Sequence, residues 1–293
     1  MPPPENHPPE APAAPVIGPV LVPKKKPKGR EDMCLMHDLF LHVCFKFDPQ
    51  KYVRRVLRVI LGFDLRLVKV NQQAEVKSLE QRSVIMDFLA EDDQGKRYNI
   101  EIQADLSGAD PHRPRYHLCV IDLSALRKGK SFADLPDAYS IFLVPGDPFN
   151  PENPRPIYVF TRRTEDGVPL GDGTTIIYVN VLYQDRNTDL GKMCHDFCCS
   201  DPNRMLIPEL QEIVSRIKTT PEGEELMGSM IAELERKAEE RGREEGREEG
   251  RRETNRDNVV RMLGLGKTLE DIAQSLALPQ DEVRLMAEQL RGA

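Results

Sequence analysis

The sequence predicts an α/β fold that is followed by a helical C-terminal extension. Apolar residues recur at helical spacing between residues 38 and 61, and three strand-like segments follow between residues 66 and 104. From residue 190 onward the pattern is helical. A strand-rich middle between helical segments is typical of a sheet that packs against helices.

The expected elements follow one another in a simple order. Residues 38–61 form a helix with a break at Asp48-Pro49, and Pro111 opens a crossover helix. Strands are expected at 66–76, 83–90, 97–104 and 138–144, with a further pair at 157–161 and 175–182. Later helices are expected at 190–199, 203–217, from about 221 onward, 269–277 and 280–290.

The 293 residues divide by composition into four parts. Residues 1–30 are a Pro-rich leader that we expect to be disordered, because it has little apolar surface to bury. The leader ends in a short basic stretch. Its alternative interpretations are contact with phosphates, a nuclear address or a solvated tail, and we favour the solvated tail. We place the main domain at 31–220, a charged Gly-repeat helix at 221–260 and a short helical pair at 261–293.

The net charge of −7 is unevenly distributed: +3 in residues 1–30, zero in 31–163 and −10 in 164–293. Whole-chain charge therefore neither supports nor excludes DNA as a partner. The sequence has no apolar run of the ~18 residues that a membrane helix needs and no secretory signal, so we expect no membrane partner. The six cysteines lack the spacing of a disulfide framework, which indicates a reducing, cytoplasmic location.

An acidic hairpin is the strongest functional signal. Asp87 lies in the apolar run 84–90, where an uncompensated carboxylate is costly. A three-residue loop ending in Gly95 makes Asp87 face Glu101 on the next strand, with the Cβ atoms about 5 Å apart. Gln103 shares the face of Glu101 because residues two apart in a strand point the same way. These oxygen ligands predict a Mg²⁺ site at Asp87 and Glu101; the alternative is a solvated hairpin in which Asp87 pairs with Lys or Arg.

Asp87, a Gly-containing turn and Glu101-x-Gln103 resemble the signature of PD-(D/E)XK nucleases, in the variant with Gln in place of Lys. From residue 38 to the C-terminus the chain is similar to the Rpn group of recombination-promoting nucleases and transposases. The matching markers are 38–41, Arg113-x-x-Tyr116, 129–132, 139–141, the glycine-repeat helix and 268–273. The resemblance implies a restriction-endonuclease-like PD-(D/E)XK core with a helical C-terminal extension.

The same resemblance implies a Mg²⁺-dependent DNA endonuclease linked to recombination or transposition. Asp87 and Glu101 would hold Mg²⁺ or another divalent cation, Gln103 would orient water, and Asp38 would extend the metal shell. Arg113 and Tyr116, one helical turn apart, would contact DNA phosphates. The alternative is a catalytically weak or inactive DNA-binding or assembly protein that retains the fold.

Three further patterns occur in the C-terminal half of the sequence. Gly242, Gly246 and Gly250 form a stripe of small residues that fits either a close-packed helix dimer or an exposed charged helix. The cysteines and histidine at 194–199 suggest zinc, but without a second ligand pair nearby buried thiols are favoured. The terminal helix pair resembles a helix-turn-helix whose second helix begins acidic, which favours packing or assembly over DNA reading.

Overall fold

The structure is a computed structural model that describes residues 29–76, 84–126 and 129–291 of the chain. The chain divides into two compact units, residues 1–228 and 229–293. The predicted disordered leader lies almost wholly outside the described residues.

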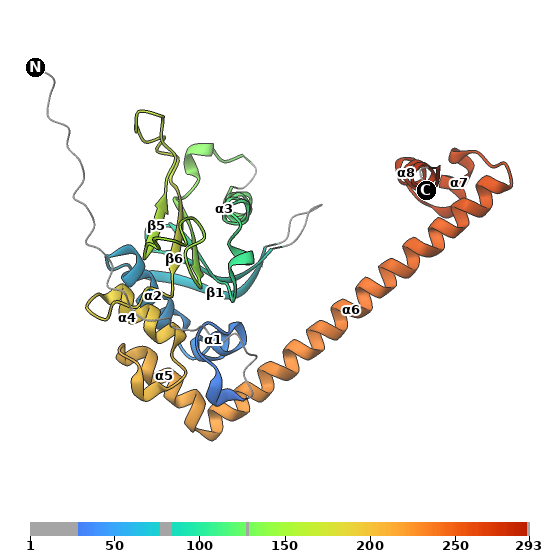
Figure 1. Ribbon diagram of the computed structural model, residues 1–293. Helices are drawn as coiled ribbons and strands as arrows, with labels where there is room; N and C mark the ends of the chain where they lie inside the picture. Colours follow the sequence, from blue (N-terminus) through green and yellow to red (C-terminus); the bar gives the residue numbers. More distant parts are fainter. Residues whose placement is uncertain (1–28, 77–83, 127–128, 292–293) are drawn as a thin grey trace, which may run out of the picture. The chain divides into compact units, whose positions relative to one another are not determined.

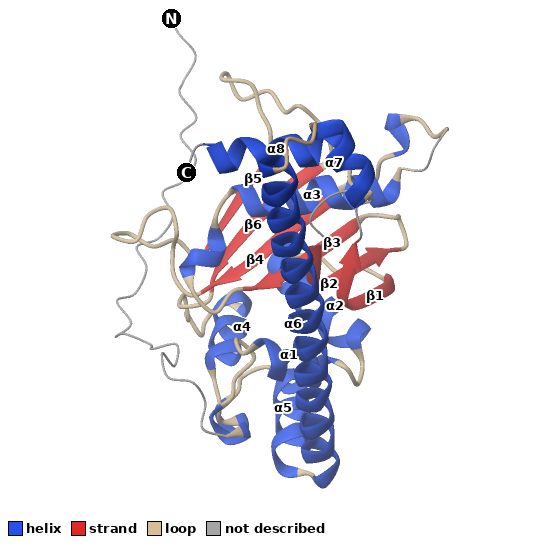
Figure 2. Ribbon diagram, turned by 90° about the vertical axis from the view of Figure 1, so that its right-hand side faces the viewer, coloured by secondary structure: helices blue, strands red, loops and turns tan. Residues whose placement is uncertain are grey.

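The first unit has the predicted α/β architecture around a mixed six-stranded sheet (Figure 2). The strand order is β1-β2-β3-β4-β6-β5. The strands are β1 (Leu67–Val76), β2 (Val84–Asp92), β3 (Arg97–Ile102), β4 (Ala138–Val144), β5 (Ile157–Phe160) and β6 (Thr174–Asn180). β1, β2 and β3 are antiparallel, β3, β4 and β6 are parallel, and β5 pairs antiparallel with β6.

Helices cover both faces of this sheet (Figure 1). On one face lies α3 (His112–Ala125), the crossover between the parallel strands β3 and β4. On the other face lie α1 (Asp38–Phe45), α2 (Pro49–Leu61), α4 (Asp189–Cys198) and α5 (Pro208–Thr219). The α3 side is filled by Met86, Leu118, Val120, Ile121 and Ala138.

The predicted break between the first two helices is confirmed. The Asp48 carboxylate accepts a hydrogen bond from Lys51 N at 2.9 Å, and Pro49 occupies the first turn of α2. Such a cap satisfies a backbone donor that has no partner within the helix. Gly62, at φ 78°, then ends α2 in the left-handed conformation that glycine adopts without strain.

The helix expected at 203–217 begins later than predicted. Residues Pro202–Arg204 form only a short 3-10 turn, and α5 starts at Pro208. The buried Asp196 carboxylate accepts hydrogen bonds from Leu206 N at 2.8 Å and Ile207 N at 2.7 Å, which fixes that segment before the helix. The sequence pattern could not reveal this contact.

Lys218 of α5 ties three separate segments together. Its buried ammonium donates hydrogen bonds to Glu31 O at 2.7 Å, to Met33 O at 2.6 Å and to Ser200 O. Burial lowers the pKa of Lys218, and the three carbonyl groups supply the acceptors that a buried ammonium needs. The N-terminal edge of the described fold is thereby fastened to α5.

The second unit contains most of α6 (Pro221–Gly264), followed by α7 (Leu269–Leu276) and α8 (Gln280–Arg291). The predicted cap of α7 is present, because the Thr268 hydroxyl accepts from Asp271 N at 3.2 Å and Asp271 accepts in return. A small core joins α6, α7 and α8 through Val259, Ile272, Ala273 and Val283. Its apolar residues therefore serve packing within the unit.

Candidate metal centre

The β2–β3 hairpin brings Asp87 and Glu101 together, with the register that the loop predicted. Phe88 pairs with Ile100, which makes Asp87 and Glu101 the next opposed positions. Asp87 Oδ2 accepts from Ile102 N at 2.8 Å, and Glu101 Oε1 accepts from Asp87 N at 3.4 Å. Each carboxylate is thus held by the backbone of the opposite strand.

The turn chemistry explains this register. The Asp92 carboxylate accepts hydrogen bonds from Gln94 N and Lys96 N, both at 2.9 Å, and from Tyr98 OH at 2.8 Å. Gly95 has φ 81°, the left-handed conformation expected at the last loop position. These local contacts set which residues of β2 and β3 face one another.

Strand β2 is irregular at Asp87. Met86 packs with Leu118 and Ile121 on the α3 side, whereas the Phe88 ring lies 5.0 Å from the His42 ring of α1. In a regular strand residues two apart point to the same face, so the chain twists locally at Asp87. Gln73, opposite Asp87 on β1, has φ 46°, which is uncommon for a non-glycine residue. Backbone strain of this kind often accompanies a functional side chain.

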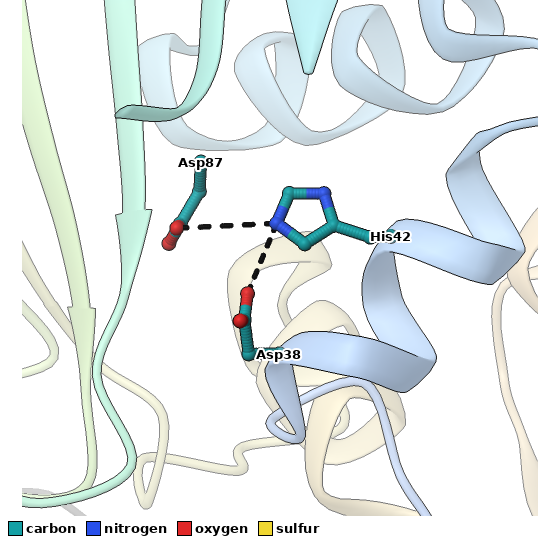
Figure 3. A group of neighbouring side chains, drawn as sticks. All are labelled: Asp38, His42 and Asp87. Carbon is teal, nitrogen blue, oxygen red and sulfur yellow. Dashed lines mark ion pairs between the residues drawn. The ribbon is translucent and has the colours of Figure 1, made fainter. Parts of the chain in front are cut away.

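Asp87 also meets two residues of α1 (Figure 3). His42 Nε2 lies 3.0 Å from Asp38 Oδ1 and 3.9 Å from Asp87 Oδ1. One ligand atom from each of the three residues lies within 4.8 Å of the others. Asp38 is 62% exposed, Asp87 18% and His42 1%, so the group runs from solvent into the core.

His42 carries a proton between these two carboxylates. Burial alone would lower its pKa, but the hydrogen bonds and charges of Asp38 and then Asp87 outweigh it and raise the pKa to about 9. A protonated imidazole therefore occupies the place beside the carboxylates where a metal cation would otherwise balance their charge. Proton and metal are expected to compete here.

Glu101 lies deeper than Asp87, with 1% of its side chain exposed. Burial, followed by the nearby Asp87 charge, raises the pKa of Glu101. Arg113 Nη2 lies 3.3 Å from Glu101 Oε2 and opposes this rise. The pair of carboxylates is thus costly to keep ionised without a cation nearby.

Gln103 and Arg113 extend the centre toward α3. Arg113 Nη1 donates to Gln103 Oε1 at 2.8 Å, and its side chain is 40% exposed. Gly108 passes so close that a Cβ there would overlap Gln103 Oε1. A glycine at this position therefore gives the Gln103 amide its space beside Arg113.

His117 closes the buried end of the centre. Its Nδ1 lies 3.5 Å from Glu101 Oε1 and 2.8 Å from Asn99 Nδ2. Burial and then the Arg113 charge lower the pKa of His117 to about 4, so its imidazole is neutral at neutral pH. The two histidines of the centre therefore differ in charge: two carboxylates raise the pKa of His42, whereas burial and then the Arg113 charge lower the pKa of His117.

The predicted site residues form two neighbouring groups: Asp38 and Asp87 lie with His42, whereas Glu101 and Gln103 contact Arg113 of α3. Glu101, a predicted metal ligand, is not part of the Asp38–His42–Asp87 group. Tyr116 is half-buried and packs against the hydrophobic cluster on the α3 side of the sheet. Sequence reasoning missed His42 and His117. Each follows a site residue by four positions, Asp38 and Arg113 respectively, and that helical spacing was a usable signal.

In the cysteine-rich segment the buried-thiol prediction holds for Cys194, whereas Cys198 and Cys199 are partly exposed. All six cysteines are free. Burial raises the pKa of Cys194 and Cys198, and His195 Nδ1 contacts Asp196 at 2.9 Å. In the described part of the chain, the group of three metal-ligating residues found is Asp38, His42 and Asp87.

No helix in the described ranges is both long enough and apolar enough to span a membrane. Comparison with protein families, curated proteins and solved structures found no match to this chain.

Proposed function

We propose that the chain is a Mg²⁺-dependent DNA endonuclease with a PD-(D/E)XK-type core, similar to the Rpn group and linked to recombination or transposition. The observation that carries this proposal is the position of Asp87 between two acidic neighbours: its carboxylate lies with Asp38 and His42 of α1, and its backbone N–H donates to Glu101 of β3. The Asp87 charge helps to raise the pKa of Glu101, so these two carboxylates repel each other. A divalent cation would offset that cost.

The donor set fits such an ion. Asp87 and Glu101, extended by Asp38, would hold it through carboxylate oxygens, the ligands that Mg²⁺ prefers. The exposed Asp38 gives access from solvent, while Glu101 is buried. When bound, the ion supplies polarisation of a phosphate and lowers the pKa of a bound water.

The remaining residues position the reactants. Because Gln103 Oε1 accepts from Arg113, the amide nitrogen is left to donate to a water molecule. An amide cannot act as a base at neutral pH, so Gln103 is a positioning residue. Arg113 supplies the positive charge that Lys would bring in the usual signature, and its exposed part is available to a DNA phosphate. The half-buried Tyr116 favours packing over phosphate contact.

A second candidate is a DNA-binding or assembly protein that keeps the fold without turnover. The protonated His42 and Arg113 favour it, because they already neutralise part of the acidic centre without metal. Plasmid nicking with Mg²⁺ or EDTA separates the two candidates. The endonuclease proposal expects nicking by the wild type with Mg²⁺, none with EDTA, and none by Asp87→Ala.

Asp93→Ala is the matched control, since this exposed residue lies in the turn of the same hairpin. It should nick like the wild type. Mg²⁺-independent nicking, or equal activity of Asp87→Ala, would contradict the assignment of the centre. DNA binding without nicking would support the second candidate.

We also propose that α6 mediates self-association. Gly242, Gly246 and Gly250 are exposed, and a Cβ added at any of them would meet open space within the chain. Nothing inside the described chain therefore explains why these helical positions lack side chains, each at a cost of about 1 kcal/mol in helix propensity. Close approach of a second α6 would use that space.

A further inference from the structure

A cavity with a positively charged lining lies where α2 meets the beginning of β1. Its volume is about 510 Å³. Its cationic lining residues are Lys51, Arg54, Arg55, Arg58 and Arg66. Three carboxylates also line it, so its balance is positive.

The helical repeat gathers these charges. Positions 51, 54, 55 and 58 are spaced by three and four residues and therefore share one face of α2. The opposite face buries Tyr52, Val53, Val56 and Leu57 in the core. Packing of α2 against β1 adds Arg66, one residue before that strand.

The charges are only partly paired. Arg54 contacts Asp64 through two hydrogen bonds of 3.0 and 2.6 Å, and Lys51 contacts Glu212 at 3.2 Å. Arg55 Nε is buried without a hydrogen-bond acceptor and lies 4.0 Å from Glu209. Within the described residues, the exposed Arg58 and Arg66 side chains form no hydrogen bond or ion pair. Two guanidinium groups without hydrogen bonds and one unsatisfied Nε thus line the same cavity.

We propose that this cavity binds a phosphate group of a nucleic acid chain, at a distance from the acidic centre. A guanidinium presents a planar fork of donors that matches phosphate oxygens, and two such forks are unengaged here. Helix α2, which lines the cavity, and helix α1, which carries Asp38 and His42, cover the same face of the sheet (Figure 1). One strand of nucleic acid crossing this face would meet both.

The spacing of residues along β1 gives the distance between the cavity and Asp87. Asp87 stands opposite Gln73, seven positions beyond Arg66. At about 3.3 Å per strand residue this corresponds to roughly 23 Å, or about seven base pairs of duplex. This inference rests on the proposed function for the role of the acidic centre, whereas phosphate binding at Arg58 and Arg66 stands on the cavity alone.

Fluorescence anisotropy with labelled duplex DNA, in EDTA to prevent cleavage, tests the inference on the full chain. The double variant Arg58→Gln/Arg66→Gln should bind a long duplex about tenfold more weakly than the wild type. Loss of two phosphate contacts should also reduce the slope of log K against log salt by about two. Arg186→Gln, an exposed arginine of the same unit outside the cavity, is the matched control and should leave both values unchanged.

Two further measurements distinguish a nucleic-acid phosphate from a free phosphate ligand. A duplex of four base pairs or so is too short to reach both sites, so the wild type should bind it much more weakly than the long duplex. Millimolar inorganic phosphate or ATP should not displace the long duplex from the wild type. Displacement by either would assign the cavity to a free phosphate ligand and overturn the nucleic-acid assignment.

Equal affinity and salt slope for wild type and double variant would overturn the inference, whatever the nicking activity. Arg58-dependent binding without any Mg²⁺-dependent nicking would retain the phosphate site and reject the endonuclease. Because both side chains are exposed and unpaired, thermal melting of the variant should match the wild type. Arg58→Lys/Arg66→Lys keeps the charge and should recover the salt slope but only part of the affinity.

Discussion

Raising the pH should destabilise the metal-free protein through His42. The pKa of His42 is raised from 6.5 to about 9 because Asp38 and Asp87 favour its charged form. Below pH 6.5 the imidazole is protonated in both folded and unfolded chains, and the ion pairs contribute fully. That stability is lost as the pH rises through about 9, where the folded form also loses its proton.

The difference between the ordinary pKa of 6.5 and the raised pKa of about 9 sets the size of the stability loss. At about 1.4 kcal/mol per pH unit, the upper limit is about 3 kcal/mol. The 62% exposure of Asp38 lets solvent screen its contribution, so a loss of about 1–3 kcal/mol is expected. Glu101 acts in the same direction, because its raised pKa also makes ionisation costly in the fold.

Urea unfolding in EDTA at several pH values between 6 and 10 or so measures this loss, and His42→Gln removes the titrating group. The fall in unfolding free energy should be shallower in His42→Gln than in the wild type. His112→Gln, a histidine whose side chain is 75% exposed, is the control and should retain the wild-type slope. Parallel curves for wild type and His42→Gln would refute the reasoning.

Three further changes probe the centre and α6. Glu101→Gln should abolish nicking yet leave the fold as stable or more stable by up to about 1 kcal/mol, because a like-charge contact is relieved; a large fall in the melting temperature would show that the carboxylate is structural. Gly108→Ala should push the Gln103 amide away from Arg113 and lower nicking with little change in melting, whereas Gly228→Ala, which meets open space, should not affect nicking. Gly246→Leu should weaken self-association in sedimentation measurements and Gly246→Ala should be mild; a shortened chain ending near Glu222 that remains as oligomeric as the whole would contradict the role of α6.

The acidic hairpin could be predicted because its register depends on local chemistry. Asp92 and Gly95 fix a short loop, and the alternation of strands then determines that Asp87 faces Glu101. The positions of the strands along the chain and the crossover helix followed from periodicity in the same way. Each of these features is encoded within a few neighbouring residues.

What the sequence did not reveal depends on contacts between distant elements. His42 reaches Asp87 only because α1 packs beside β2, and the late start of α5 depends on hydrogen bonds from Leu206 and Ile207 to Asp196. The cavity lined by Arg58 and Arg66 likewise needs α2 and the start of β1 to meet. Periodicity within one segment carries no information about such partners.

The Lys218 contacts also bear on the order in which the chain folds during synthesis. Met33, whose carbonyl oxygen accepts a hydrogen bond from Lys218, lies 185 residues before that lysine. At a synthesis rate of about 5–20 residues per second, Met33 waits roughly 10–40 s before Lys218 exists. The Lys218 contacts that hold the segment leading into Asp38 therefore cannot form until nearly all of the sheet-containing unit has been made, so the Asp38–His42–Asp87 group is completed late.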